Sequence, residues 1–499
     1  MSIAQCKKTA FRFLLRGRCC RSAKKRNDIS LHPRADYEQK TYRCHLNSSD
    51  MTTKPIGPLL RRLAVPVGIG FFFNTMFNVV DTWYASRLST QAVAAVSLSF
   101  PLFFLIIAVG SGISTGATAL IGHALGAGRR EEAERYAAQT ISFALLHGIL
   151  LTIFGWLATP FIFRLMGAEG EYLALAVAYM GAMFCGSAFF VANQAHNAIL
   201  NASGDTKSFR NFLLLAFTLN LIYDPWFIYG GFGLPPLGLA GIAWGTVTIQ
   251  FIGTLYLHHR ARQTGLLGGL GWHGFAPRRA MFQELARMGF PSSLTMLTVA
   301  VGIFVIIWYV GRFGHEAVAA YGIATRVEQI VLLPVMGLNV ATLTLVAQNS
   351  GARQFDRVRE TIRTALKNGI TLMCIGTFLV FVFAAPLMRF FTADPPVIAI
   401  GVEYLRIVAF LFHAYVILYI NSFALQGLQR PRFALYLGIF RQFLAPMPVF
   451  WLLAIVLGWG VIGVWWGVFF VNWLAAGLSL LYIRKTMREL LDDDGLSGS

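Results

Sequence analysis

The amino-acid sequence predicts an all-α polytopic membrane protein, built from twelve transmembrane helices arranged as two parallel, pseudo-symmetric six-helix lobes. Composition is the first observation behind this prediction. Hydrophobic residues make up 56% of the 499 residues and charged residues only 13%, and the mean hydropathy is +0.59. A soluble protein of this length does not need so much apolar surface. The second observation is an internal repeat, described below.

Twelve segments are long and apolar enough to cross a bilayer, which takes about 20 mostly apolar residues as a helix. Backbone groups in lipid must be paired within the protein, so these segments are expected to be helices; short alternating segments of the kind found in a barrel are absent from the sequence. The predicted spans are 59–84, 93–118, 137–159, 173–195, 209–230, 238–258, 289–311, 317–344, 367–388, 401–424, 434–457 and 460–482.

The loops differ in charge according to the side of the membrane on which they are predicted to lie. Loops after even-numbered spans are rich in Lys and Arg, as in "GAGRREEAERYA" and "GARQFDRVRETIR", and loops after odd-numbered spans carry few positive residues. The positive-inside rule then places both termini in the cytoplasm. The net charge of +19 follows from this topology and from the N-terminal tail, so it gives no reason to expect a nucleic-acid partner.

Residues 1–50 are unlike the rest of the chain. They hold four of the six cysteines and 12 of the 42 Lys and Arg residues, and they contain no secretory signal. We expect a basic, disordered tail with no metal or disulfide role for its cysteines, and Met51 looks like a natural start.

The internal repeat defines the lobes. A shift of 225 residues aligns "WYASRLSTQAVAAV" at 83–96 with "WYVGRFGHEAVAAY" at 308–321, and a shift of 222 aligns "GLAGIAWGT" with "GVIGVWWGV". Because each half has an even number of spans, the halves are parallel and related by an axis along the membrane normal. The predicted organisation is an N-terminal lobe at 51–258, a cytoplasmic linker at 259–283, a C-terminal lobe at 284–485 and a cytoplasmic tail at 486–499.

Polar residues gather at one depth of the first lobe. Asp81 in span one, Asn220 and Asp224 on one face of span five, and Thr246 in span six all lie roughly 7–12 Å below the outer surface at about 1.5 Å per residue. Acids inside a membrane mark ion pathways more often than not. Hard oxygen ligands suit Na⁺, whereas two close carboxyl groups that cannot easily both be ionised suit H⁺.

Several motifs resemble those of the multidrug and toxic compound extrusion transporters. They are "NVVD" in span one, "NASGDTK" after span four, "NLIYDP" in span five, "GLAGIAWGT" opening span six, "AYGIATRVEQIVLLP" in span eight and "ALQGLQRPR" after span ten. The resemblance covers roughly residues 55–485. It implies a cation-coupled exporter of varied, often cationic, amphipathic compounds, and it matches Asp81, Asn220, Asp224 and Thr246 to the family's coupling-ion site in the N-terminal lobe.

The repeat provides an internal comparison for these four residues. Their counterparts in the second half are Ile306, Ala445, Val449 and Val468, so the scaffold is kept but the polar set is not. Span seven has no acid, which resembles the branch of the family that couples through the first lobe only. Phe77 stands where relatives often have Tyr. The missing hydroxyl favours H⁺ over Na⁺, although both ions stay open.

Other polar residues have weaker signals. Asn193, Gln194 and Asn197 in span four are expected to line a substrate cavity, and Pro66 in span one to act as a hinge. Arg326 and Glu328 in span eight are expected to pair with each other and close the second lobe.

The predicted function is therefore a secondary antiporter that exports organic compounds in exchange for H⁺ or Na⁺ by rocking of its two lobes. We expect no other cofactor or metal, small organic compounds and the lipid bilayer as partners, a monomeric state and a place in the bacterial inner membrane. A lipid-linked-precursor flippase of the wider superfamily is the alternative, but it would show extra spans and a strongly cationic cavity. An enzyme is disfavoured, because no His-Glu-x-x-His or Gly-x-Ser-x-Gly motif lies in the spans.

Overall fold

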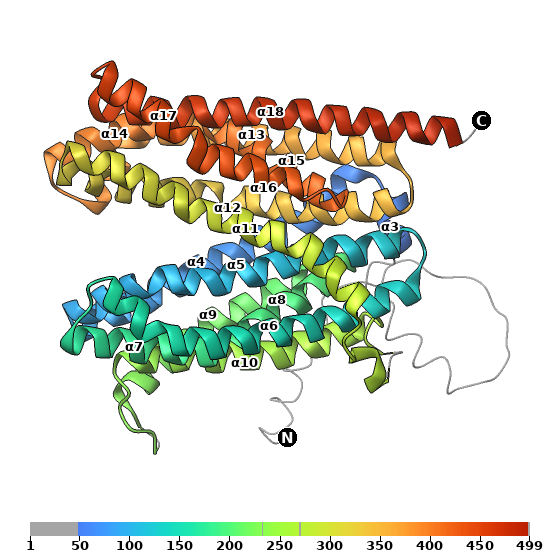
Figure 1. The fold of residues 1–499 in the computed structure, drawn as a ribbon, viewed down its shortest axis with the longest axis horizontal. Helices are drawn as coiled ribbons and strands as arrows, with labels where there is room; N and C mark the ends of the chain where they lie inside the picture. The colour runs from blue at the N-terminus through green and yellow to red at the C-terminus, as the bar shows by residue number, and fades with distance from the viewer. Residues whose placement is uncertain (1–47, 232, 269–270, 498–499) are drawn as a thin grey trace, which may run out of the picture. The chain divides into compact units, whose positions relative to one another are not determined.

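The computed structural model describes residues 48–231, 233–268 and 271–497, which form helices and connecting turns with no sheet (Figure 1). Of the basic tail predicted at residues 1–50, residues 1–47 lie outside the described residues. A short helix, α3 (Ser48–Thr53), precedes the first span.

Fifteen α-helices follow α3 along the described residues, most of them long. In the first half they are α4 (Ile56–Leu88), α5 (Thr90–Gly126), α6 (Arg130–Leu165), α7 (Gly170–Cys185), α8 (Ser187–Ala202), α9 (Thr206–Tyr229) and α10 (Leu239–Gln263). In the second half they are α11 (Arg279–Val310), α12 (His315–Gly351), α13 (Phe355–Phe391), α14 (Pro395–Ala409), α15 (Phe412–Gly427), α16 (Arg432–Ile439), α17 (Pro446–Phe450) and α18 (Gly460–Ser497).

Ten of the described helical segments are apolar and long enough to cross a membrane, and the number rises to twelve when each of two bent helix pairs counts as one span. The twelve-helix prediction is therefore confirmed. Helices continue beyond the predicted lobe boundaries: α10 runs to Gln263 and α11 begins at Arg279, so the connection between the lobes is shorter than 259–283 and contains a 3-10 turn at Trp272–Phe275. The predicted tail from 486 continues α18 as helix to Ser497.

Spans four and ten are broken, although the sequence suggested one continuous helix for each. The pair α7 and α8 bends by 43°, and the pair α14 and α15 bends by 51°. Each break frees a backbone carbonyl, and a threonine of the preceding span donates to it: Thr152 to Phe184 at 2.8 Å and Thr377 to Ala409 at 2.6 Å. The two threonines are related by the repeat, as are the two carbonyls. Both lobes thus hold the bend in the same way, which satisfies backbone groups that lipid could not.

The span that follows α15 is irregular as well. Between α16 and α18 the chain forms two π-helical stretches, Phe440–Leu444 and Trp451–Val456, on either side of α17. Pro446 and Pro448 lie between these stretches and have no backbone N–H to donate, so the regular helical ladder cannot run through them.

The two lobes meet mainly through four helices, which pair in a repeat-related pattern. Helix α5 packs on α11, α4 packs on α12, and α5 and α12 pack on each other. In Figure 1 the C-terminal lobe, coloured yellow to red, lies beside the N-terminal lobe, coloured blue to green.

The contact between α5 and α12 is a backbone-to-backbone approach at the ends of both helices. A Cβ atom at Gly126 would overlap the carbonyl oxygen of Gln348, and one at Gly351 would overlap that of His123. Gly126 and Gly351 are again related by the repeat. We call this contact, made by residues 122–126 of α5 and 347–351 of α12, the glycine seam. It holds the lobes together at the end that the loop charges predict to be cytoplasmic.

The glycine seam leads to a prediction. Gly351→Ala should separate the lobes at this end, because backbone atoms that cannot move aside occupy the space of the new methyl group. Overpacking of this kind costs about 1–3 kcal/mol. A cysteine introduced at Ala347, which is fully buried at the seam, should then react faster with a maleimide, in a chain whose native cysteines are replaced by serine.

The matched control is Gly322→Ala on the same helix, where a Cβ atom has open space around it. That variant should leave the labelling rate of the cysteine unchanged. Equal labelling rates for the two alanine variants would contradict the role given to the seam.

Candidate ion-coupling site

A hydrogen bond between α4 and α9 forms the centre of the site. The side-chain amide of Asn220 donates to the carboxylate of Asp81 at 2.8 Å. Asn220 is fully buried and Asp81 is 7% exposed. A buried carboxylate is costly unless donors reach it, so this bond fixes α4 against α9 at the level of the acid.

Asp224 and Thr246 complete the set that the sequence singled out. Asp224 lies one helical turn after Asn220 on α9 and is fully buried. Its carboxyl group lies close enough to Asp81 for the two acids to interact electrostatically, and Thr246 on α10 also lies near Asp81. The structure thus brings all four predicted residues together, from three helices.

Several oxygen atoms of these four residues lack hydrogen-bond partners. Both carboxylate oxygens of Asp224, Oδ1 of Asn220 and the hydroxyl of Thr246 are buried and have no hydrogen-bond donor among the described residues. Buried polar atoms in folded proteins nearly always have a partner. A proton shared by the two acids, or a cation bound between them, would satisfy these oxygens.

Two further residues shape the site and were missed from the sequence. Gly245 precedes Thr246, and a Cβ atom there would lie 3.2 Å from Oδ1 of Asp224, so glycine lets the carboxylate approach the backbone of α10. Tyr179 on α7 is buried, and it lies near enough to Asp81 and Asp224 to interact electrostatically with both. Tyr179 lies in an apolar stretch of sequence that gives no sign of a functional role. Gly245 could have been suspected only because it precedes Thr246.

The second lobe has no such set at the equivalent positions. Ala445 and Val468 are buried apolar residues there. An acid does occur elsewhere in that lobe: Glu328 on α12 accepts a hydrogen bond from the Tyr404 hydroxyl at 2.9 Å. The expected pair between Glu328 and Arg326 is wrong, since residues two apart on a helix point to different sides and Arg326 is exposed.

The residues expected to line a substrate cavity point in different directions. The amide of Asn193 donates to Gln250 of α10, at 2.9 Å to the backbone and 2.7 Å to the side chain, and is buried. Gln194 packs instead towards Gly110 of α5. Asn197 is partly buried, with a side-chain oxygen that has no donor among the described residues. Their role in substrate binding stays a prediction.

Pro66 is buried inside α4, fifteen residues before Asp81. The helix runs through it without interruption from Ile56 to Leu88. Because proline has no N–H, the carbonyl one turn earlier lacks its helical partner, which lowers the resistance of α4 to bending at this point.

Comparison with known proteins agrees with this architecture. The "Probable multidrug resistance protein YoeA" of Bacillus subtilis is 29% identical over 422 residues, covering 84% of this chain and 91% of its own. The "FAD transporter" of Shewanella oneidensis is 28% identical over 405 residues, covering 80% and 88%.

A solved structure is similar along almost all of its length. It is the outward-facing conformation of a multidrug resistance MATE family transporter of the MOP superfamily, with a TM-score of 0.84 and 25% identity, covering 90% of this chain and 99% of that chain. The MatE family itself matches residues 66–226 and 291–452, one segment in each lobe. The chain therefore belongs to the MatE family of multidrug and toxic compound extrusion transporters.

Proposed function

We propose that this protein is a secondary antiporter, which exports amphipathic, often cationic organic compounds in exchange for a cation bound by Asp81 and Asp224. The observation that carries the proposal is the buried pair of acids in one lobe, with unpaired oxygens around it and apolar residues at the repeat-related positions of the other lobe. A pair needed only for folding would be expected in both lobes.

The proposed transport cycle follows from competition between the cation and the substrate for binding to the N-terminal lobe. With the lobes apart on the outer side, the cation reaches Asp81 and Asp224 and weakens the binding of substrate, which leaves. The lobes then part at the glycine seam and expose the site to the cytoplasm, where substrate displaces the cation. Coupling requires only that each ligand weaken the binding of the other. Bending of α4 at Pro66 would link the state of Asp81 to this motion.

The geometry favours H⁺ as the coupling ion. Asn220 turns its N–H₂ group, a donor, towards Asp81, whereas Na⁺ would require its oxygen. Two neighbouring carboxyl groups also hold a proton between them more readily than two charges. Phe77, which is buried, supplies no hydroxyl ligand.

We further propose that the protein lies in the bacterial inner membrane as a monomer. Both of its termini would then be in the cytoplasm. The relatives named above come from bacteria. One of them is called a transporter of FAD, an anionic compound, so the preference for cationic substrates is the part of the proposal that most needs a transport assay.

Asp81→Asn and Asp224→Asn should each abolish coupled efflux of a fluorescent dye from cells and vesicles, because neither variant can take up and release the ion. Protein level and thermal stability should stay near those of the unmodified chain, since the amide has the same shape as the carboxyl group. Ile306→Leu and Val449→Ile, at the repeat-related positions, are the controls and should transport normally. Normal efflux by both Asn variants would rule out the site.

Gly245→Ala tests the approach of Asp224 to α10. The new methyl group would meet the Asp224 carboxylate in a contact tighter than most real ones, so the carboxylate must shift, at a cost of about 1–3 kcal/mol. Dye efflux should fall and its pH profile should change. Gly477→Ala, where a Cβ atom has open space in α18, should leave both unchanged; a Gly245→Ala variant that behaves like this control would show that the close approach is unimportant.

Asn220→Ala separates the two ions. An H⁺-coupled carrier should keep its turnover and move its activity profile to higher pH, because the ionised Asp81 loses its donor. A Na⁺-coupled carrier should lose Na⁺ affinity sharply, because one ligand has gone. The measurement is dye transport in vesicles under a pH gradient alone and a Na⁺ gradient alone, and transport driven only by Na⁺ would overturn the choice of H⁺.

A further inference from the structure

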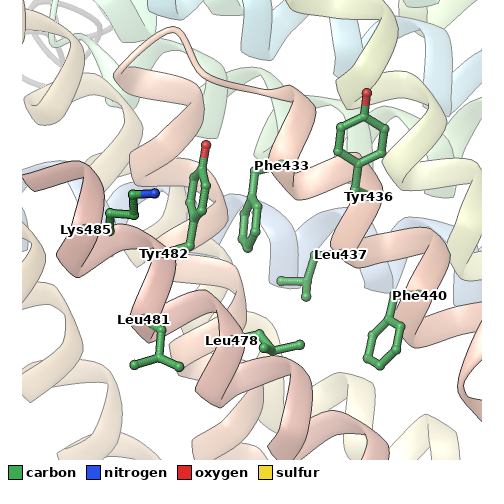
Figure 2. Close-up of a pocket in the computed structure, with 8 residues that line it drawn as sticks. All are labelled: Phe433, Tyr436, Leu437, Phe440, Leu478, Leu481, Tyr482 and Lys485. Carbon is green, nitrogen blue, oxygen red and sulfur yellow. The ribbon is translucent and has the colours of Figure 1, made fainter. Parts of the chain in front are cut away.

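A groove opens between the first turns of α16 and the last membrane turns of α18, in the C-terminal lobe (Figure 2). Its volume is about 430 Å³, within the range of roughly 300–1,000 Å³ that is typical of pockets for small molecules. It is lined by Phe433, Tyr436, Leu437, Phe440, Leu478, Leu481, Tyr482 and Lys485. We call this feature the α16–α18 groove.

The lining residues follow one helical pattern on both sides. They stand at i, i+3, i+4 and i+7 on α16 and the turn after it, and again on α18, so each helix presents a single stripe. Stripes of this kind normally pack against each other. Here the rings of Phe433 and Tyr482 stack, 3.7 Å apart and parallel within 1°, but α16 makes few other contacts with α18 within the described residues.

The repeat shows that this opening belongs to one lobe only. In the first lobe α9 packs along α10, whereas α16 makes no comparable contact with α18 within the described residues. The first lobe is closed by Phe212, whose ring fills the space beside Gly253, and by a hydrogen bond from Arg260 to Ser208 at 2.8 Å. At the repeat-related positions the second lobe has Leu437, Ala475, Tyr482 and Phe433.

Towards its other end the second lobe is closed. Helix α17 and the π-helical stretch Trp451–Val456 both pack on α18. The groove therefore lies in the half of the span that begins at Arg432, on the side that the loop charges predict to be cytoplasmic. Its wall faces outward from the lobe: Tyr436 is 64% exposed and Leu481 65% exposed. For a membrane-spanning helix, such residues are exposed to lipid.

The groove has one polar end and one apolar end. Figure 2 shows Nζ of Lys485 and the hydroxyl oxygen of Tyr482 near each other on the α18 wall, with Leu478, Leu481 and Phe440 towards the other end; the hydroxyl of Tyr436 lies at the polar end on the opposite wall. Lys485 is exposed and forms no ion pair among the described residues. The neighbouring acid Glu489 is already paired with Arg430 at 3.1 Å.

Additional positive charge surrounds the polar end. Arg432 begins α16, and Arg484 and Arg488 flank Lys485 on α18; all three are exposed. Lys and Arg at this depth attract anionic headgroups, with about 1 kcal/mol for each residue near the surface. A cationic amphiphile of the kind proposed for export would be repelled by the same charges.

From this combination we infer that the α16–α18 groove binds one anionic phospholipid of the adjacent leaflet. An acyl chain lies along Phe440, Leu478 and Leu481, and the headgroup phosphate pairs with Lys485 and accepts a hydrogen bond from Tyr482. The lipid supplies the apolar contacts that α16 and α18 do not make with each other. This site is separate from Asp81 and Asp224, which belong to the other lobe, and it does not depend on the proposed transport cycle.

Native mass spectrometry of the detergent-purified full chain tests the inference directly. Dioleoyl phosphatidylglycerol should remain bound as a single tight adduct, and dioleoyl phosphatidylcholine should bind more weakly. Lys485→Gln should weaken the phosphatidylglycerol adduct by about fivefold, the factor that corresponds to about 1 kcal/mol, while Arg484→Gln, next to the groove but not lining it, should weaken it less. Glycerol 3-phosphate should not compete, because it has no acyl chain.

A second variant tests the apolar end. Leu481→Trp should fill the groove and reduce retention of both lipids, and Leu255→Trp is the control at a position in α10 that is similarly exposed, at 58%. The inference is overturned if the two lipids bind equally and Lys485→Gln behaves like Arg484→Gln, or if Leu481→Trp retains phosphatidylglycerol as the unmodified chain does. Folding of each variant is checked by its thermal unfolding in detergent.

Discussion

The requirement that every polar group inside the bilayer find its partner within the protein governs most of this structure. The hydrogen bond from Asn220 to Asp81 is its clearest expression, since it joins two helices at the point where a carboxylate would otherwise be isolated. The same requirement explains the threonines at the breaks of spans four and ten. The requirement is left unmet at Asp224 and Thr246, and these are the oxygens that the proposed function assigns to the coupling ion.

The repeat shows which features of the lobes come from architecture and which from function. The bends, their threonine partners and the glycines of the seam occur in both halves, because both halves must fold and meet in the same way. The carboxyl pair occurs in the first half only, and the α16–α18 groove in the second half only. In the two proposals, each lobe therefore carries its own ligand chemistry on a common scaffold. The hydrogen bond between Glu328 and Tyr404 is a third arrangement, and the first lobe has no acid at the position equivalent to Glu328.

Much of the fold could be predicted from the sequence, because segment length, hydropathy and the 225-residue repeat are properties of whole segments and do not depend on the contacts of single side chains. The closeness of Asp81, Asn220, Asp224 and Thr246 followed from counting residues from the ends of straight spans. The breaks at Gly186 and near Phe410 could not be predicted in the same way, since both lie in apolar runs without proline. Tyr179 and Gly245 were also missed: their importance comes from neighbours on other helices, which hydropathy does not reveal.

The glycine seam also has an energetic consequence. Hydrophobic stabilisation scales with the apolar area removed from water, at about 25 cal/mol per Å². Glycines at 122, 126 and 351 and an alanine at 347 bury very little such area, so the lobes are held there by close fit and by a hydrogen bond from the side-chain amide of Gln348 to the carbonyl of Ala202 at 2.6 Å. Parting the lobes at the seam, as the proposed cycle requires, would expose few methyl groups to water and would therefore cost little hydrophobic free energy. In the proposed cycle, a contact that buries so little apolar side-chain area is suited to being made and broken at every turnover.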